Sequence, residues 1–70
     1  MVNHPGRSRL YVVVCASGHN WLVRAASEDA ALADWKREAE KGNAEAANYV
    51  RRPNDRSEIN YLRHIGQADA

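Results

Sequence analysis

An uninterrupted apolar run near the N-terminus sets the first constraint on how this chain folds. Residues 10–16, LYVVVCA, are rich in β-branched side chains, a pattern typical of a strand that is covered on both faces. The SGHN sequence that follows supplies glycine and asparagine, which tolerate the positive φ angles of a tight turn. Residues 21–26, WLVRAA, then return as a second strand. The sequence therefore predicts a β-hairpin over residues 9–26.

A helix is predicted directly after the hairpin, over residues 28–41. Ser27 has the short side-chain oxygen of a good N-cap. Glu28 and Asp29 follow in the first turn, where the helix dipole favours acidic side chains. Gly42 is a suitable residue to end the helix. Four apolar side chains recur at helical spacing and form the predicted buried stripe, namely Ala31, Leu32, Trp35 and Ala39.

The C-terminal third predicts a short second helix and a third strand. Residues 44–51 are predicted to be helical and to end before Pro53, because proline pushes the preceding residue out of the α region. Residues 58–65 fit two patterns. Ile59, Tyr61, Arg63 and Ile65 alternate as in a strand, and Ile59, Leu62 and Ile65 also have helical spacing. We favour the strand, because an isolated two-stranded hairpin is marginally stable in water.

These elements predict one small α+β domain over residues 1–70. The expected order is β-β-α-α-β, with a small antiparallel sheet and with a long and a short helix packed on one face. Residues 1–8 and 67–70 are expected to be flexible. One helix layer covers only one face of the sheet, so Tyr11, Val13 and Cys15 are predicted to remain available to a partner.

The sequence predicts a cytoplasmic protein. Cys15 is the single cysteine, which excludes an intramolecular disulfide and fits a reducing compartment. The MVNHPGRSR sequence at the N-terminus lacks the apolar region of a signal peptide. The longest apolar run is also far short of the roughly 20 residues that span a bilayer. We therefore expect no contact with a membrane.

No catalytic or metal-binding set is predicted, and we expect neither an enzyme nor a cofactor. The three histidines, His4, His19 and His64, are far apart, and neither a Cys-x-x-Cys nor a His-x-x-x-His pair is present. The hairpin brings His19 near Cys15, but an apolar surrounding raises the pKa of a thiol and makes it inert. The four glycines are isolated, unlike those of phosphate-binding loops.

The charges are separated along the chain, which points to two candidate partner-binding surfaces. Residues 28–45 contain six acids and three bases, whereas the rest of the chain contains seven arginines and three acids. The acidic candidates are Asp34 and Glu38, and the alternative is an ordinary solvated helix face. The basic and aromatic candidates are Arg51, Arg52, Arg56, Tyr61 and Arg63. Arginine and tyrosine together are typical of protein interfaces and of nucleic-acid sites, and the alternative is a solvated basic loop.

The general plan of residues 11–35, a hairpin followed by Ser-Glu-Asp-Ala and a helix, resembles several small bacterial and phage modules. These include the N-terminal part of toxin-antidote proteins and compact anti-CRISPR proteins. The resemblance covers about a third of the chain and lies in its plan rather than in signature residues. It implies an inhibitor that acts by stoichiometric binding. No DNA-binding segment of the antidote type is recognisable, so the phage-type inhibitor is ranked first.

Three kinds of partner follow from these observations. The first is a protein of a bacterial nucleic-acid-handling complex, such as a CRISPR-Cas complex in the host cytoplasm. The second is a nucleic acid, bound by the basic loop of Arg51, Arg52 and Arg56 in a small binding or antidote-type module. The third is a second copy of the chain, which would pair with an open edge of the sheet.

Overall fold

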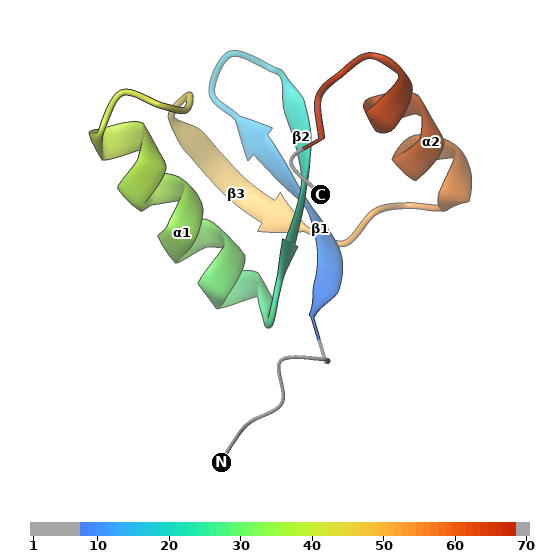
Figure 1. Cartoon of the computed structure of the whole chain (residues 1–70), viewed down its shortest axis with the longest axis horizontal. Helices are drawn as coiled ribbons and strands as arrows, with labels where there is room; N and C mark the ends of the chain where they lie inside the picture. The colour runs from blue at the N-terminus through green and yellow to red at the C-terminus, as the bar shows by residue number, and fades with distance from the viewer. Residues whose placement is uncertain (1–7, 69–70) are drawn as a thin grey trace.

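A computed structural model describes residues 8–68 as an α+β domain with a three-stranded antiparallel sheet and two helices, which confirms the predicted fold class (Figure 1). Strand β1 lies in the middle of the sheet, whose order is β2-β1-β3. In chain order the elements are β1 (Arg9–Cys15), β2 (Asn20–Ala25), α1 (Glu28–Glu40), β3 (Ala47–Arg51) and α2 (Arg56–His64).

The hairpin and the first helix agree with the sequence-based prediction. Strand β1 pairs with β2, with Val12 opposite Leu22. The connecting turn contains Gly18 at a φ of 97°, a conformation that glycine adopts without steric cost. Ser27 caps α1 by accepting a hydrogen bond from the backbone N–H of Ala30 at 3.1 Å. Gly42 follows the helix at a φ of 83°, as expected for a C-terminal stop.

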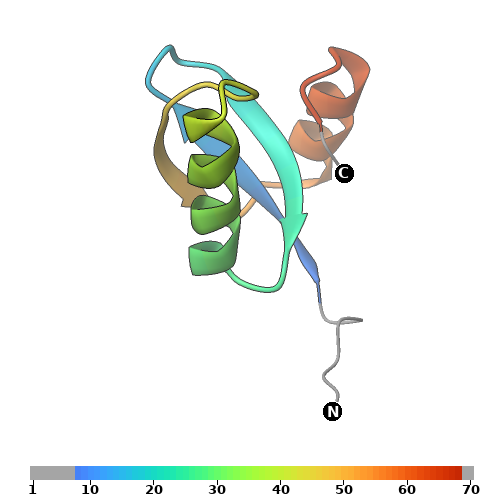
Figure 2. The same ribbon diagram turned by 60° about the vertical axis from the view of Figure 1, so that its left-hand side comes forward.

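The two helices lie on opposite faces of the sheet (Figures 1 and 2), so the prediction that both pack on one face is wrong. Neighbouring residues of β1 point to opposite faces, and both Val12 and Val13 are fully buried. Val12 lies beneath α2, with Leu22 and Leu62. Val13 lies beneath α1, with Trp35. The apolar character of both faces of β1 therefore reflects two helix layers.

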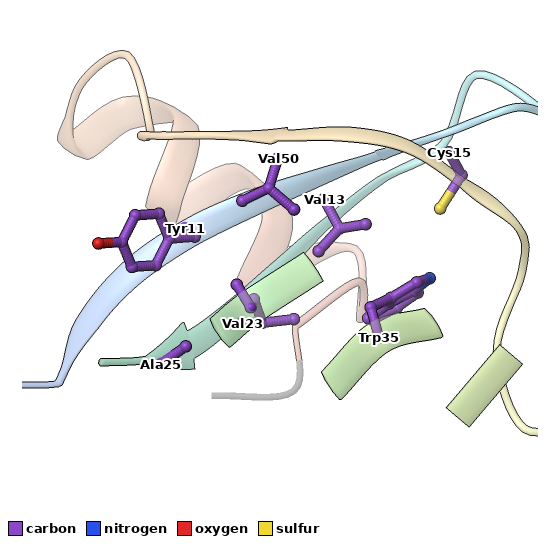
Figure 3. Packing of buried hydrophobic residues seen from close by; sticks show 8 residues of the cluster. Tyr11, Val13, Cys15, Val23, Ala25, Trp35 and Val50 are labelled. Atoms are coloured by element: carbon purple, nitrogen blue, oxygen red, sulfur yellow. The ribbon is translucent and has the colours of Figure 1, made fainter. Parts of the chain in front are cut away.

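The predicted contact surface of Tyr11, Val13 and Cys15 is also wrong, because these side chains belong to the main core. All three are buried beneath α1 (Figure 3). Val23 and Ala25 of β2, Val50 of β3, and Ala31 and Trp35 of α1 complete this cluster. It joins four of the five elements, so it positions the hairpin, α1 and β3 relative to one another.

The prediction of a helix over residues 44–51 is wrong, because this segment contains β3. Strand β3 pairs antiparallel with β1 and places Val50 opposite Val13. The pairing satisfies the backbone groups on the free edge of β1 and buries Val50, which outweighs the helix propensity of the alanines nearby. A bulge between Val14 and Cys15 adjusts the register.

The prediction of a strand over residues 58–65 is wrong as well, so the observed order is β-β-α-β-α. Helix α2 begins after Asp55, which accepts a hydrogen bond from the backbone N–H of Glu58 at 2.9 Å. Ile59 and Leu62 face the sheet at helical spacing. Residues 58–65 were predicted to pair with the hairpin as its third strand. Strand β3 occupies that place in the sheet.

The chain after α2 returns to the sheet. The backbone N–H of Leu22 donates to the carbonyl of Gln67 at 2.9 Å, and Leu22 forms a parallel bridge with Ala68. Residues 67 and 68 therefore lie against β2, and their flexibility stays a prediction, as it does for Ser8. Residues 1–7 and 69–70, for which flexibility is also predicted, lie outside the described residues. This return covers part of the outer edge of β2. Within residues 8–68, the outer edge of β3 pairs with no further strand.

Candidate functional site

Arg51, at the end of β3, is held in an ion pair rather than presented to a partner. Its guanidinium makes two hydrogen bonds to the Glu58 carboxylate of α2, at 3.0 and 2.7 Å. These bonds lower the pKa of Glu58 and raise that of Arg51. Because both side chains are partly buried, the pair fixes the start of α2 against the sheet. Arg51 therefore stabilises the fold. The sequence did not predict this, because the pair forms only when α2 packs against the sheet.

Arg52 also contacts the body of the domain. Its guanidinium donates to the carbonyl of Leu10 at 3.0 Å and lies over the ring of Tyr11, 5.4 Å from the centroid. A cation stacked on an aromatic face is stabilised by the ring quadrupole. Arg52 nonetheless stays exposed, so its charge remains at the surface near the first residues of β1.

The remaining three basic and aromatic candidates are exposed on α2, but the helix does not bring all three together. Arg56 and Arg63 are seven residues apart, so they lie on one side of the helix, whereas Tyr61, two residues before Arg63, points to a different side. All three are exposed, and Tyr61 retains 61% of its surface. No ion pair joins Arg56 or Arg63 to another residue between positions 8 and 68. We call Arg56, Tyr61 and Arg63, with the exposed Ile65, the α2 surface.

The acidic candidates, Asp34 and Glu38, are compensated within α1 and the loop that follows. Asp34 forms an ion pair with Arg37 one turn later. Glu38 contacts the Lys41 ammonium at 3.4 Å and the Asn43 side-chain amide at 3.2 Å. The hydrogen bond from Asn43, and then that from Lys41, lower the pKa of Glu38. The acidic helix therefore has counter-charges of its own, unlike the α2 surface.

A fourth group, which the sequence analysis did not single out, is centred on Glu45 in the loop before β3. Its carboxylate accepts hydrogen bonds from the Ser17 hydroxyl and from the Trp21 indole N–H, the latter at 2.9 Å. Nδ1 of His19 lies 2.9 Å from the same carboxylate. The bonds from Ser17, then Trp21, then His19 lower the pKa of Glu45 to about 2. The backbone carbonyl of Glu45 also accepts from the Trp35 indole at 2.7 Å.

This Glu45 cluster has no signature that the sequence could have shown. The hairpin turn and the loop before β3 are more than 20 residues apart, and they meet only because β3 pairs with β1 beside the turn. Beside this cluster Trp21 packs against Trp35, with ring centroids 5.9 Å apart and planes tilted by 41°.

The contacts in the Glu45 cluster differ from those of a serine-histidine-carboxylate triad. In such a triad the nucleophile contacts one ring nitrogen and the carboxylate contacts the other. Here the Ser17 hydroxyl, at 3.2 Å, and Glu45 both contact Nδ1 of His19. The Cys15 thiol is buried, and its pKa is raised by that burial and then by the charge of Glu45.

Between residues 8 and 68, no three His, Cys, Asp or Glu side chains are grouped so that they could hold a metal ion. In the same range no helix is long and apolar enough to cross a membrane.

The chain was compared with protein-family models, with curated proteins and with solved structures. None of the three comparisons finds a match.

Proposed function

We propose that this chain is a non-enzymatic binding protein that contacts a protein partner through the α2 surface. The observation that carries the proposal is that two exposed arginines of α2 have no ion-pair partner in the described part of the chain. Arg56 and Arg63 are exposed without an ion pair among residues 8–68, on the helix that also exposes Tyr61 and, at its end, Ile65. Arginine and tyrosine are the residues that most often dominate the binding energy of a protein interface.

The internal contacts of two arginines favour a protein partner over a nucleic acid. Arg51 is engaged by Glu58, and Arg52 by Leu10 and Tyr11. The affinity for nucleic acid grows with the number of phosphates that are neutralised. Because Arg51 of the predicted basic loop is bonded to Glu58, few cations of that loop remain to contact phosphates. An aromatic and apolar component, Tyr61 with Ile65, suits a protein surface better.

The non-enzymatic part of the proposal is supported by the geometry of the reactive side chains. Cys15 faces the core and has a raised pKa, which disfavours the nucleophilic thiolate. The Ser17 hydroxyl donates a hydrogen bond to the Glu45 carboxylate, and His19 contacts both groups through Nδ1. In a catalytic triad the histidine instead contacts the serine through one ring nitrogen and the carboxylate through the other.

A narrower proposal rests on the resemblance in general plan. It states that the chain is a phage-type inhibitor that binds a bacterial CRISPR-Cas complex stoichiometrically in the host cytoplasm. The hairpin and helix that carry the resemblance are β1, β2 and α1. One fold supports many functions, so the α2 surface, rather than the plan, has to be tested.

The test is capture of partners from bacterial lysate by the immobilised chain. We expect a protein bound at stoichiometric level by the original chain and lost with the double variant Arg56→Ala, Arg63→Ala. The matched control is Lys36→Ala with Arg37→Ala, which removes two exposed cations from α1 instead. Retention of the partner by the α2 variant, or its equal loss from both variants, would contradict the proposal.

A gel-shift experiment separates the nucleic-acid alternative. Phosphate contacts weaken steeply with salt, so binding through them appears at low salt and disappears at high salt. We expect no shift at either salt concentration. A low-salt shift that the α2 double variant removes would favour a nucleic acid as the partner.

A further inference from the structure

A groove of about 560 Å³ opens on the α1 side of the molecule, away from the α2 surface. It lies where the end of α1, the loop that follows and the start of β2 meet, and Trp21, Trp35, Glu38 and Glu45 form its walls. This volume is within the usual range for a ligand site. The function proposed above does not use this groove.

The aromatic wall of the groove suits a cation. Trp21 and Trp35 are the two tryptophans of the chain, and their rings lie 5.9 Å apart. Both indole N–H groups are already bonded to Glu45, one to its carboxylate and one to its carbonyl. A ligand in the groove would therefore meet carbon atoms of the rings rather than a donor, chiefly those of Trp21, because Trp35 is buried. The face of an indole ring attracts cations more strongly than the other aromatic side chains do.

The charge of the groove has the matching sign. Two of the three donors to the Glu45 carboxylate, the Ser17 hydroxyl and the Trp21 N–H, are neutral groups. They keep the carboxylate ionised and in place without cancelling its charge. Glu38 adds a second carboxylate, and its contact with Lys41 at 3.4 Å is exposed to solvent, where charge pairing is weak.

The end of α1 also lies at the groove, where Gly42 and Asn43 form part of the lining. The last carbonyl groups of the helix accept hydrogen bonds from the backbone N–H groups of residues 41–43, which hold this loop in place. Aromatic carbon atoms and two carboxylates thus meet in one groove.

We propose that this groove binds a guanidinium group, the arginine side chain of a partner polypeptide. A planar guanidinium stacks on an indole ring and also reaches a carboxylate with its forked donors. The groove is open rather than enclosed, whereas small-molecule sites usually bury most of their ligand. It is therefore suited to the end of a side chain that stays attached to a larger molecule.

Tryptophan fluorescence tests this proposal directly, because both tryptophans line the groove. The probe is N-acetyl-arginine amide, and the matched control is N-acetyl-citrulline amide, which has nearly the same shape without the charge. We expect a saturable change in emission with the arginine compound, in the millimolar range expected for a single side chain. The citrulline compound is expected to give no saturable change.

A pair of variants locates the binding. Glu45→Gln would disturb the hydrogen bonds that hold the loop, so the test uses Glu38→Gln, whose contacts are on the surface. We expect Glu38→Gln to weaken binding about three- to fivefold. The control is Glu40→Gln, which makes the same change of charge near the same end of α1 but outside the groove. We expect it to leave the affinity for the arginine compound unchanged. Equal responses to the two compounds, no saturable response to the arginine compound, or equal affinities of the two variants would overturn the proposal.

Discussion

The face of the sheet beneath α1 and the face beneath α2 differ in what holds each helix in place. The α1 face has eight buried side chains from four elements, and both indole N–H groups near it bond to one residue, Glu45. The α2 face has three, Val12, Leu22 and Leu62. Helix α2 also depends on the Arg51–Glu58 ion pair at its start and on the return of residues 67 and 68 to β2.

The two helices differ in the same way in their exposed charges. Asp34 and Glu38 of α1 have partners on the same helix or in the following loop, whereas Arg56 and Arg63 of α2 have none among residues 8–68. The two acidic candidates of α1 are therefore matched by neighbours within the domain. Helix α2 uses its inner side for a small apolar contact, and two of its exposed arginines have no ion-pair partner in the described part of the chain.

The largest effect is expected on the α1 face, from Trp35→Ala. This variant leaves a cavity in the main core and removes the hydrogen bond to Glu45, at a cost of about 3 to 5 kcal/mol. A chain of this length has a total stability of roughly 4 to 10 kcal/mol, so most of the margin is lost. Chemical denaturation followed by circular dichroism measures the change. A cost no larger than that of Leu62→Ala would contradict the comparison.

A smaller and more local effect is expected on the α2 face, from Leu62→Ala. We expect the free energy of unfolding to fall by about 2 kcal/mol, which is at the lower end for a buried Leu→Ala substitution. The reason is that the few neighbours of Leu62 can move into the cavity that the substitution leaves. Hydrogen exchange should show faster exchange in α2 while α1 and β1 keep most of their protection. Equal loss of protection in both helices would show that the two faces unfold as one unit.

The α1 face was also the part that the sequence predicted best. The cap at Ser27, the helix spacing of Ala31 and Trp35 and the turn at Gly18 are local signals, and each appears in the structure. These features are predictable because their physical causes lie within a few residues or one chain reversal.

Around α2 the sequence was misleading for physical reasons. Large side chains at every second position from Ile59 to Ile65 fit a strand. The decisive helix signal was the Asp55 cap three residues before Glu58. Val50 belongs to a strand only because β1 offers a free edge and an apolar partner there. Of the candidate binding residues, Arg51 has a structural partner that only the folded chain brings near.

The smallest effect that separates the two faces is a pH dependence, tested with Glu58→Gln. In the folded chain the hydrogen bonds from Arg51 lower the pKa of Glu58, so the unfolded chain binds the proton more tightly. The stabilisation is therefore present above about pH 4.5 and is lost as the pH falls through the lowered pKa. At neutral pH the variant should be about 1 kcal/mol less stable, because one charged hydrogen-bonding partner of Arg51 is removed.

Unfolding midpoints between pH 7 and pH 2 should fall less steeply for Glu58→Gln than for the original chain. The remaining slope is assigned to the α1 side, where the pKa of Glu45 is lowered to about 2. Parallel curves for the two chains would show that the ion pair beneath α2 does not contribute to acid sensitivity.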